Sequence, residues 1–147
     1  WHTGKPLVKK GGSVVLLSPL PLRFDTPTHL PFQGFFEKVL PETRDPSEMA
    51  RRWETLFSGR PEYVSAYRRR HAYHGLQPFH AWYQAWNVLS QVGHVFVVGA
   101  DPKVAQRFGF EAVSNVEVAI QAAREHAGKD ARIAAPVLPP AFGIAVR

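Results

Sequence analysis

Two short apolar runs, far apart in the chain, constrain the fold most strongly. Ser13–Ser18 (SVVLLS) lies between a glycine pair and a proline, and His94–Val98 (HVFVV) follows Gly93. Both runs are rich in β-branched and aliphatic residues without alternating polar ones, a pattern typical of strands buried on both faces of a parallel sheet. Segments with helical patterns separate the runs, so we expect parallel pairing through crossover connections.

Helix signals fill the segment between the two runs. Asp45 and Glu48 bracket Pro46 in the pattern of a capping box, which predicts the start of a helix there. Apolar residues at helical spacing predict the buried faces of this helix and of a shorter one before it. The shorter helix carries Phe35, Phe36, Val39 and Leu40, and the longer one Met49, Trp53, Leu56 and Phe57.

The stretch from Arg68 to Gln91 combines arginine, histidine and aromatic residues, and it is the one place where the sequence indicates a function. A helix from Pro61 should end near His74, and Pro78 should open the next, because proline is tolerated in the first helical turn. This next helix is apolar on two faces, which predicts that protein surrounds it on most sides. Its larger face holds Phe79, Trp82, Tyr83, Trp86 and Ser90, its smoother face Ala81, Ala85 and Val88, and its polar row His80, Gln84, Asn87 and Gln91.

The remaining elements complete an α/β pattern. After the second apolar run we expect a short helix from Pro102, a short strand at Phe110–Val113, a helix capped by Ser114, and a last strand beginning at Arg132 (RIAAPVLPP). The fold class is therefore α/β over one domain, residues 1–147. We expect a three-layer α/β/α arrangement with a small, mainly parallel sheet of three to four strands, and several extra helices between the first two strands.

The charge of the chain invites a nucleic-acid partner, but its distribution argues against one. The formal net charge is +6, yet the basic residues are scattered and only Arg68, Arg69 and Arg70 form a cluster. That cluster falls at the end of an expected helix, where cations complement the helix dipole. A solvated helix end is the simpler interpretation, and an anion or partner site is the alternative. We expect no nucleic-acid partner.

The composition also indicates the cellular compartment that we expect for the protein. No apolar run approaches the roughly 20 residues of a membrane span, so we expect no membrane association. Cysteine is absent, which excludes disulfides and favours a reducing compartment; we expect a cytoplasmic protein.

Motifs of complete enzymes are missing from the sequence. It has no Gly-x-Gly-x-x-Gly or phosphate loop, no Gly-x-Ser-x-Gly elbow, and no pair of acids placed for general acid/base chemistry. His71, His74 and His80 have a spacing that could bind a metal if the intervening turn folded back, but histidines at helix ends are more often packed. We expect no metal site in this chain.

Five sequence motifs, in this order along the chain, resemble those of one known family. The first is Leu7–Leu17 (LVKKGGSVVLL), the second Pro78–Trp82 (PFHAW) at the start of the long helix, and the third the strand His94–Val98. Gly109–Val113 (GFEAV) and Ser114–Glu117 (SNVE) follow, ahead of an alanine-rich helix. Their order and spacing resemble the C-terminal domain of the lactate racemase family, the enzymes that use a nickel-pincer nucleotide.

The resemblance covers nearly the whole chain and implies the lid-like second domain of a racemase or epimerase of 2-hydroxy acids. It implies that the nickel-pincer cofactor and the catalytic histidines belong to an N-terminal catalytic domain of the same polypeptide, outside this sequence. The isolated chain is then expected to bind no cofactor and to be inactive, while the parent is an isomerase. One type of family member contributes a tryptophan from this helix to the active-site wall, and Trp82 is the matching residue.

A lid that closes over chemistry next to a carboxylate should present polar and cationic groups to the cleft. None of these residues is expected to be catalytic itself. The substrate-cleft candidates are His80, Trp82, Gln84, Arg68, Arg69, Arg70 and His74, with the arginines suited to pair bidentately with a carboxylate. Packing is an equal alternative for Trp82, which lies on the larger apolar face. The alternative for the whole chain is a stand-alone α/β module that binds a small acidic ligand.

Overall fold

A parallel sheet of three strands forms one end of the protein. The computed structural model describes residues 8–128 and 130–134. Within them, β1 (Ser13–Leu17), β2 (His94–Val98) and β3 (Glu111–Val113) pair in the order β1-β2-β3, with all pairs parallel. The predicted small parallel sheet is confirmed, including the short strand predicted at Phe110–Val113.

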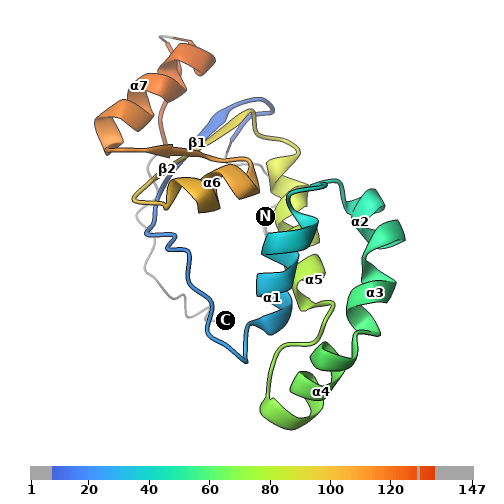
Figure 1. Cartoon of the computed structure of the whole chain (residues 1–147). Coiled ribbons are helices and arrows are strands. Elements are labelled where there is room, and N and C mark those ends of the chain that lie inside the picture. Colours follow the sequence, from blue (N-terminus) through green and yellow to red (C-terminus); the bar gives the residue numbers. More distant parts are fainter. Residues whose placement is uncertain (1–7, 129, 135–147) are drawn as a thin grey trace, which may run out of the picture.

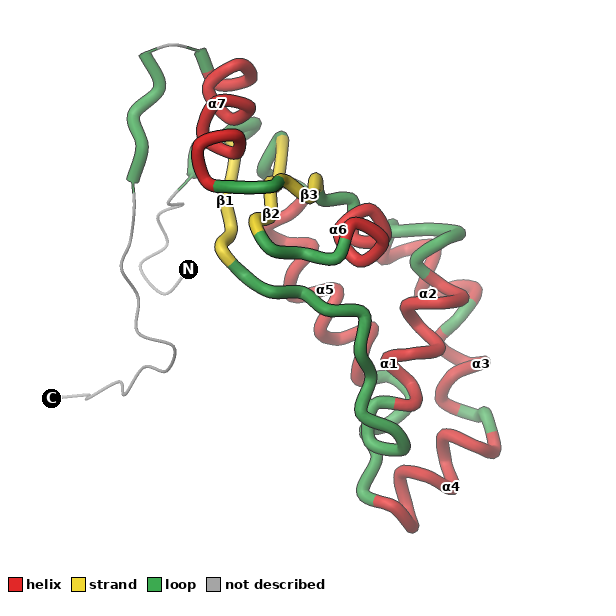
Figure 2. The backbone as a smooth tube through the Cα atoms, turned by 60° about the vertical axis from the view of Figure 1, so that its left-hand side comes forward, coloured by secondary structure: helices red, strands yellow, loops and turns green. Residues whose placement is uncertain are grey.

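Helices cover both faces of this sheet (Figure 1). The helix α7 (Val116–Ala127) lies on one face, and α6 (Pro102–Phe108) lies on the other. A helical insertion between β1 and β2 extends away from the sheet (Figure 2). It consists of α1 (Leu30–Gly34), η1 (Phe35–Val39, a π-helix), α2 (Pro46–Arg52), α3 (Glu54–Ser58), α4 (Pro61–Arg70) and α5 (Gln77–Leu89). The three layers and the extra helices agree with the expected fold class.

The two apolar runs differ in burial. In β2, Val95, Phe96 and Val97 are buried, as a central strand requires. In β1, Leu16 is 39% exposed and Leu17 is 68% exposed. The prediction that both runs are buried on both faces is therefore wrong for β1, because β1 lies at the edge of the described sheet and has β2 as its only partner there.

An aromatic core holds the helical insertion together. Phe79 of α5 is fully buried and meets Phe35 and Phe57 edge-to-face, with ring centroids 4.9 and 5.1 Å apart. The predicted apolar face of the first helix is confirmed, since all four of its residues are buried. They are Phe35, Phe36, Val39 and Leu40.

The helix predicted to follow Asp45 is divided in two. Trp53 leaves helical geometry at φ −120°, and this break separates α2 from α3. Met49 and Phe57 are buried as expected, but Leu56 is 63% exposed. The prediction of one continuous apolar face is wrong, because the break at Trp53 ends the register that would place Leu56 over Met49.

The predicted caps are partly correct. The Asp45 carboxylate accepts from the Glu48 backbone N–H at 2.9 Å, as expected. Glu48 does not complete the box, because the Asp45 N–H donates to the Thr43 hydroxyl. At α7 the cap is Asn115, which accepts from a backbone N–H at 2.9 Å, and the assignment of Ser114 is wrong.

The chain after α7 was predicted to form a last strand. Arg132–Ala134, the part of that strand inside the described residues, is irregular. The rest of the predicted strand lies outside the described residues. In the part of the chain that the structure describes, no helix is both long and apolar enough to cross a membrane.

Candidate functional site

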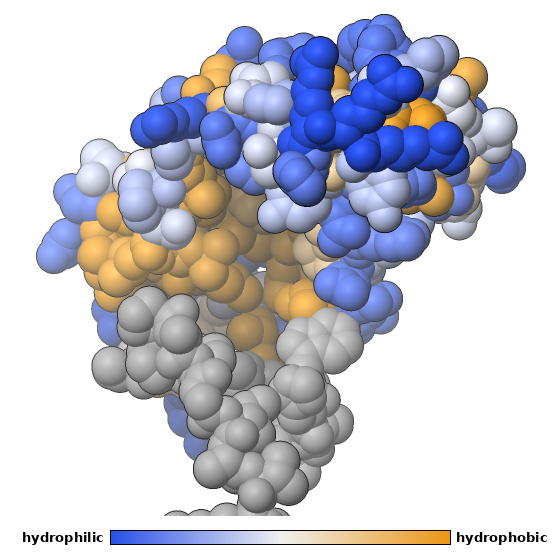
Figure 3. Space-filling view, turned by 90° about the horizontal axis from the view of Figure 1, so that it is seen from below, coloured by the Kyte–Doolittle hydropathy of each residue, from blue (hydrophilic) through white to orange (hydrophobic). Residues whose placement is uncertain are grey.

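The C-terminal turn of α4 carries the arginine cluster, Arg68–Arg70. Its three side chains are exposed, and within the described residues none of the three guanidinium groups forms an ion pair. Figure 3 views the molecule from the end where α4 lies, and strongly hydrophilic side chains gather there. The cluster is thus available to an anionic group from outside the domain.

The helix α4 ends earlier than predicted. We expected it to reach His74, but it ends at Arg70 because His71 adopts the left-handed conformation, φ 54° and ψ 26°. The backbone N–H groups of His71 and Ala72 both turn back to the carbonyl of Ala66. This turn leaves the arginines in the last helical turn, next to carbonyls that have no helical partner.

The loop after α4 places the His74 ring edge-to-face on Tyr67 of α4, with ring centroids 5.1 Å apart. The Tyr73 N–H donates to the Thr28 carbonyl at 3.0 Å, and the Tyr73 ring stacks on His29 at 5.4 Å, which fixes the loop to the rest of the domain. His74 is exposed, and its Nδ1 accepts from the Leu76 N–H at 3.2 Å. Because Nδ1 accepts this hydrogen bond, Nε2 is the ring nitrogen of His74 that is left to bond with other groups.

Trp82 lies in the core and not on the surface. It is 5% exposed, its ring stacks on Phe108 at 6.0 Å, and its indole N–H donates to the Arg44 carbonyl at 2.9 Å. A buried indole whose N–H is satisfied joins α5 to the neighbouring segments. The geometry therefore supports the packing interpretation of Trp82.

The outward side of α5 carries the polar row. His80, Gln84, Asn87 and Gln91 are all exposed. Ala81 and Ala85 are exposed beside them, so the prediction that protein surrounds this helix on most sides is wrong. The insertion packs on one face of α5 only, burying Pro78, Phe79 and Trp82. His80 and Gln84 lie one helical turn apart, which places their Cβ atoms about 5–6 Å from each other.

The candidate residues form two sets and not one enclosed pocket. The arginine cluster and His74 lie at the end of α4, while His80 and Gln84 lie along α5. Two open grooves lie elsewhere: one of about 570 Å³ includes Lys38, Trp53 and Arg60 in its lining, and one of about 510 Å³ lies on α7. Apart from the buried Trp82, the residues of both sets are exposed.

No described group of side chains fits a metal ion. Within residues 8–128 and 130–134, no cluster of three histidine, cysteine, aspartate or glutamate residues is arranged to hold one. His71 is the left-handed residue after α4, His74 is bonded within its own loop, and His80 lies on α5. The donor set that a nickel cofactor requires is therefore not provided by the described residues.

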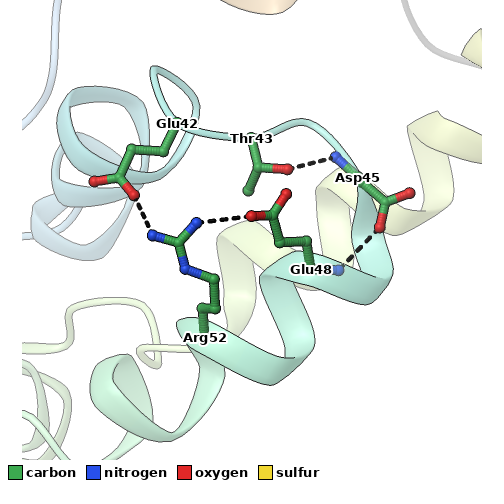
Figure 4. A network of polar contacts seen from close by, with 5 residues as sticks. All are labelled: Glu42, Thr43, Asp45, Glu48 and Arg52. Atoms are coloured by element: carbon green, nitrogen blue, oxygen red, sulfur yellow. Dashed lines mark hydrogen bonds and ion pairs between the residues drawn. The ribbon is translucent and has the colours of Figure 1, made fainter.

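A polar network that the sequence patterns did not indicate joins α2 to the segment before it (Figure 4). Arg52 bridges the carboxylates of Glu42, at 2.5 Å, and Glu48, at 2.7 Å. A hydrogen bond from Thr43 and the neighbouring Arg52 guanidinium lower the pKa of Glu48. The network is solvent-exposed and satisfied within itself, so it fixes the start of α2 and does not offer a free binding group.

Two further polar contacts also involve residues far apart in sequence. The Tyr83 hydroxyl donates to Glu54 at 2.7 Å. Burial of the hydroxyl is the main cause that raises the pKa of Tyr83, and the hydrogen bond to Glu54 is the second. His94 of β2 stacks on His126 of α7 at 3.6 Å, and its Nδ1 lies 3.0 Å from a Glu111 oxygen. The stacking of His94 on His126 joins α7 to the sheet.

Comparison with known proteins returned no matching family model, no matching curated protein and no matching solved structure.

Proposed function

We propose that this chain is the C-terminal, lid-like domain of a lactate racemase-like enzyme that acts on 2-hydroxy acids. The catalytic partner is the N-terminal domain of the same polypeptide, which holds the nickel-pincer nucleotide. The observation that carries the proposal is the exposed polar row on α5, which leaves His80 and Gln84 without a partner in the described part of the chain.

The order of elements supports the proposal. The resemblance implies a glycine-preceded strand, a long helix, a second strand, a Gly-Phe phrase and a capped, alanine-rich helix. These correspond to β1, α5, β2, the turn at Gly109 and α7. Gly109 has φ +81°, and a Cβ there would lie 2.9 Å from the Arg44 guanidinium, so glycine is required at the start of that phrase.

The described side chains suit binding and orientation. Arginine forms bidentate hydrogen bonds with carboxylates, and the arginine cluster has no acidic partner in the described residues. Histidine and glutamine at His80 and Gln84 can donate to or accept from a hydroxyl group. A lid with such groups closes over a 2-hydroxy acid, excludes water, and strengthens the polar contacts of the cleft.

In this proposal the cofactor belongs to the N-terminal domain, as the resemblance implies. When bound, the nickel-pincer group supplies the chemistry at the substrate carbon. The contribution of this chain is limited to binding the substrate carboxylate, orienting its hydroxyl group and covering the cleft.

The proposal is tested with the polypeptide encoded by the whole reading frame, loaded with cofactor. We expect interconversion of the D and L forms of a short 2-hydroxy acid, measured by chiral chromatography, and no interconversion by residues 1–147 alone. A full-length, cofactor-loaded polypeptide that leaves a panel of 2-hydroxy acids unchanged would contradict the proposal.

A second candidate is a stand-alone module for a small acidic ligand. The observation that favours it is the arginine cluster in the last turn of α4, which is exposed and has no acidic partner in the described residues. Calorimetric titration of residues 1–147 with lactate and with inorganic phosphate distinguishes it. Binding by the isolated chain that is lost in Arg69→Ala, but kept in the α7 control Arg124→Ala, would favour this second function.

A further inference from the structure

The groove of about 570 Å³ is lined by η1, the break at Trp53, α3 and the start of α4. Its volume lies within the range of sites for small organic ligands. Lys38 and Arg60 are the charged residues of its lining, and no acidic residue among the described ones belongs to it. The apolar part of the lining consists of Trp53, Leu56, Phe57 and Pro61.

The local backbone brings these apolar side chains together at the surface. The break at Trp53 separates α2 from α3, and Gly59 ends α3 without a side chain that could cover the groove. Leu56 of α3 is 63% exposed. A single exposed leucine is ordinary, but this one shares a groove with Trp53 and Pro61. The groove can therefore bury the apolar part of a ligand.

Trp53 is held in the groove wall by ring contacts and not by a hydrogen bond. Its ring meets Phe57 edge-to-face at 6.1 Å, and the Arg52 guanidinium lies 5.9 Å from its centroid. The indole Nε1 is buried and has no hydrogen-bond partner, a state that among the described residues only Ser13 Oγ shares. Buried donors nearly always have an acceptor, so the bonding of this side chain is incomplete within the described residues.

The cations at the groove are not balanced equally. Arg60 pairs with Glu62 at 3.1 Å, whereas Lys38 is exposed and forms no ion pair within the described residues. The pKa of Glu62 is lowered first by the Arg60 hydrogen bond and last by the charge of Lys38, so both cations act on one carboxylate. The carboxylate of Glu37 accepts from Gln33 instead. Lys38 is therefore the cation of the lining that is available to an anion from outside.

We propose that this groove binds a small carboxylate with an apolar body, of the aryl or branched alkyl class. The body lies against Trp53 and Leu56, and the carboxylate lies near Lys38. An exposed ion pair contributes little, so the apolar contacts supply most of the affinity and the charge supplies a preference. The site is distinct from the proposed substrate cleft, whose polar row lies on α5.

Titration of residues 1–147 with 3-phenylpropionate, followed in ¹H–¹⁵N NMR spectra, tests the proposal. The chain has four tryptophans, and the signal that disappears in Trp53→Phe identifies the Trp53 indole. We expect a saturable shift of that signal, while the Trp82 indole, bonded to the Arg44 carbonyl, keeps its position. The neutral 3-phenylpropanamide, which has the same body without the charge, should bind about two- to fivefold more weakly.

Two variants at exposed positions separate the apolar contribution from the charged one. Leu56→Ala should weaken the acid and the amide alike, because it removes apolar contact only. Lys38→Gln should abolish the preference for the acid, whereas the matched control Lys103→Gln, at an exposed lysine of α6, should keep it.

An unshifted Trp53 signal at saturating 3-phenylpropionate would overturn the proposal, and so would equal affinities of the parent chain for the acid and the amide. Binding that is lost in Arg69→Gln and unchanged in Lys38→Gln would also overturn it, because that result assigns the carboxylate to the arginine cluster.

Discussion

His71 holds a backbone conformation that non-glycine residues rarely adopt. Its φ of 54° ends α4 directly after the arginine cluster. The sequence around it has no glycine until Gly75, which is why the end of this helix was placed four residues too late. Glycine stops were otherwise reliable, as Gly59 and Gly109 show.

Replacing His71 with glycine should stabilise the domain. The left-handed conformation costs a histidine about 1–2 kcal/mol, and the greater freedom of glycine in the unfolded chain offsets part of the gain. We expect His71→Gly to raise the free energy of unfolding by about 0.5–1 kcal/mol in urea denaturation. His71→Ala serves as the control, and it should not be more stable than the parent. A loss of stability in His71→Gly would show that the imidazole itself has a structural contact.

Glu48 gives a pH dependence with a defined sign. Its pKa is lowered below the ordinary value of 4.5 in the folded protein, by Thr43 first and then by Arg52. A lowered folded pKa contributes stability that is present above about pH 4.5 and is lost as the pH falls through the folded value. We expect the parent to lose more stability than Glu48→Gln between neutral and acidic pH, as followed by thermal denaturation. Equal losses would show that solvent screens the network fully.

The helix caps could be predicted from the sequence, but the side-chain contacts between residues far apart in the sequence could not. Asp45 and Asp101 cap the helices that begin at Pro46 and Pro102, since capping depends on residues two or three apart. The Glu42–Arg52 pair spans ten residues, and the Tyr83–Glu54 contact spans 29. Contacts of that kind depend on tertiary packing, which local patterns do not contain.

Helix packing in the insertion includes a close approach of α1 to α4 at Gly34. Gly34 at the end of α1 faces α4, and a Cβ there would collide with the Tyr63 hydroxyl and lie 3.2 Å from the ring carbon that bears it. Tyr63 is buried, so it has little room to move.

Gly34→Ala should therefore destabilise the domain by about 1–3 kcal/mol, despite the better helix propensity of alanine. Urea denaturation measures this, and Gly34→Ala combined with Tyr63→Phe should recover part of the loss because the hydroxyl is removed. Unchanged or increased stability in Gly34→Ala would mean that α1 and α4 are not closely packed.

The presence of helices and strands was predicted better than the breaks within helices and the place of each strand in the sheet. The proline-led starts of α2, α4, α5 and α6 were correct, since proline fixes a geometry that the first helical turn accepts. The break at Trp53 and the exposure of Leu17 were missed. Neither a helix break without glycine or proline nor the position of a strand at a sheet edge is encoded in apolar spacing.

At the scale of the whole molecule, the sheet and the helical insertion were predicted from two apolar runs and the helical patterns between them. The exposure of the candidate residues was predicted only in part. The polar row and the arginine cluster are exposed as a site requires, whereas Trp82 is buried and bonded to the Arg44 carbonyl. A helical wheel shows which residues share a face but not which face the fold covers, and this explains the exposed Ala81 and Ala85.

The polar row on α5 is the part of the proposed function that a single measurement tests most directly. In the cofactor-loaded, full-length polypeptide, the double variant His80→Ala, Gln84→Ala should lower kcat/KM for a 2-hydroxy acid at least roughly tenfold, about 1.4 kcal/mol of transition-state stabilisation. The Tm should stay unchanged, because both side chains are exposed, and the α7 control Gln121→Ala should keep full turnover. Unchanged turnover in the double variant would contradict the assignment of this row to the substrate cleft.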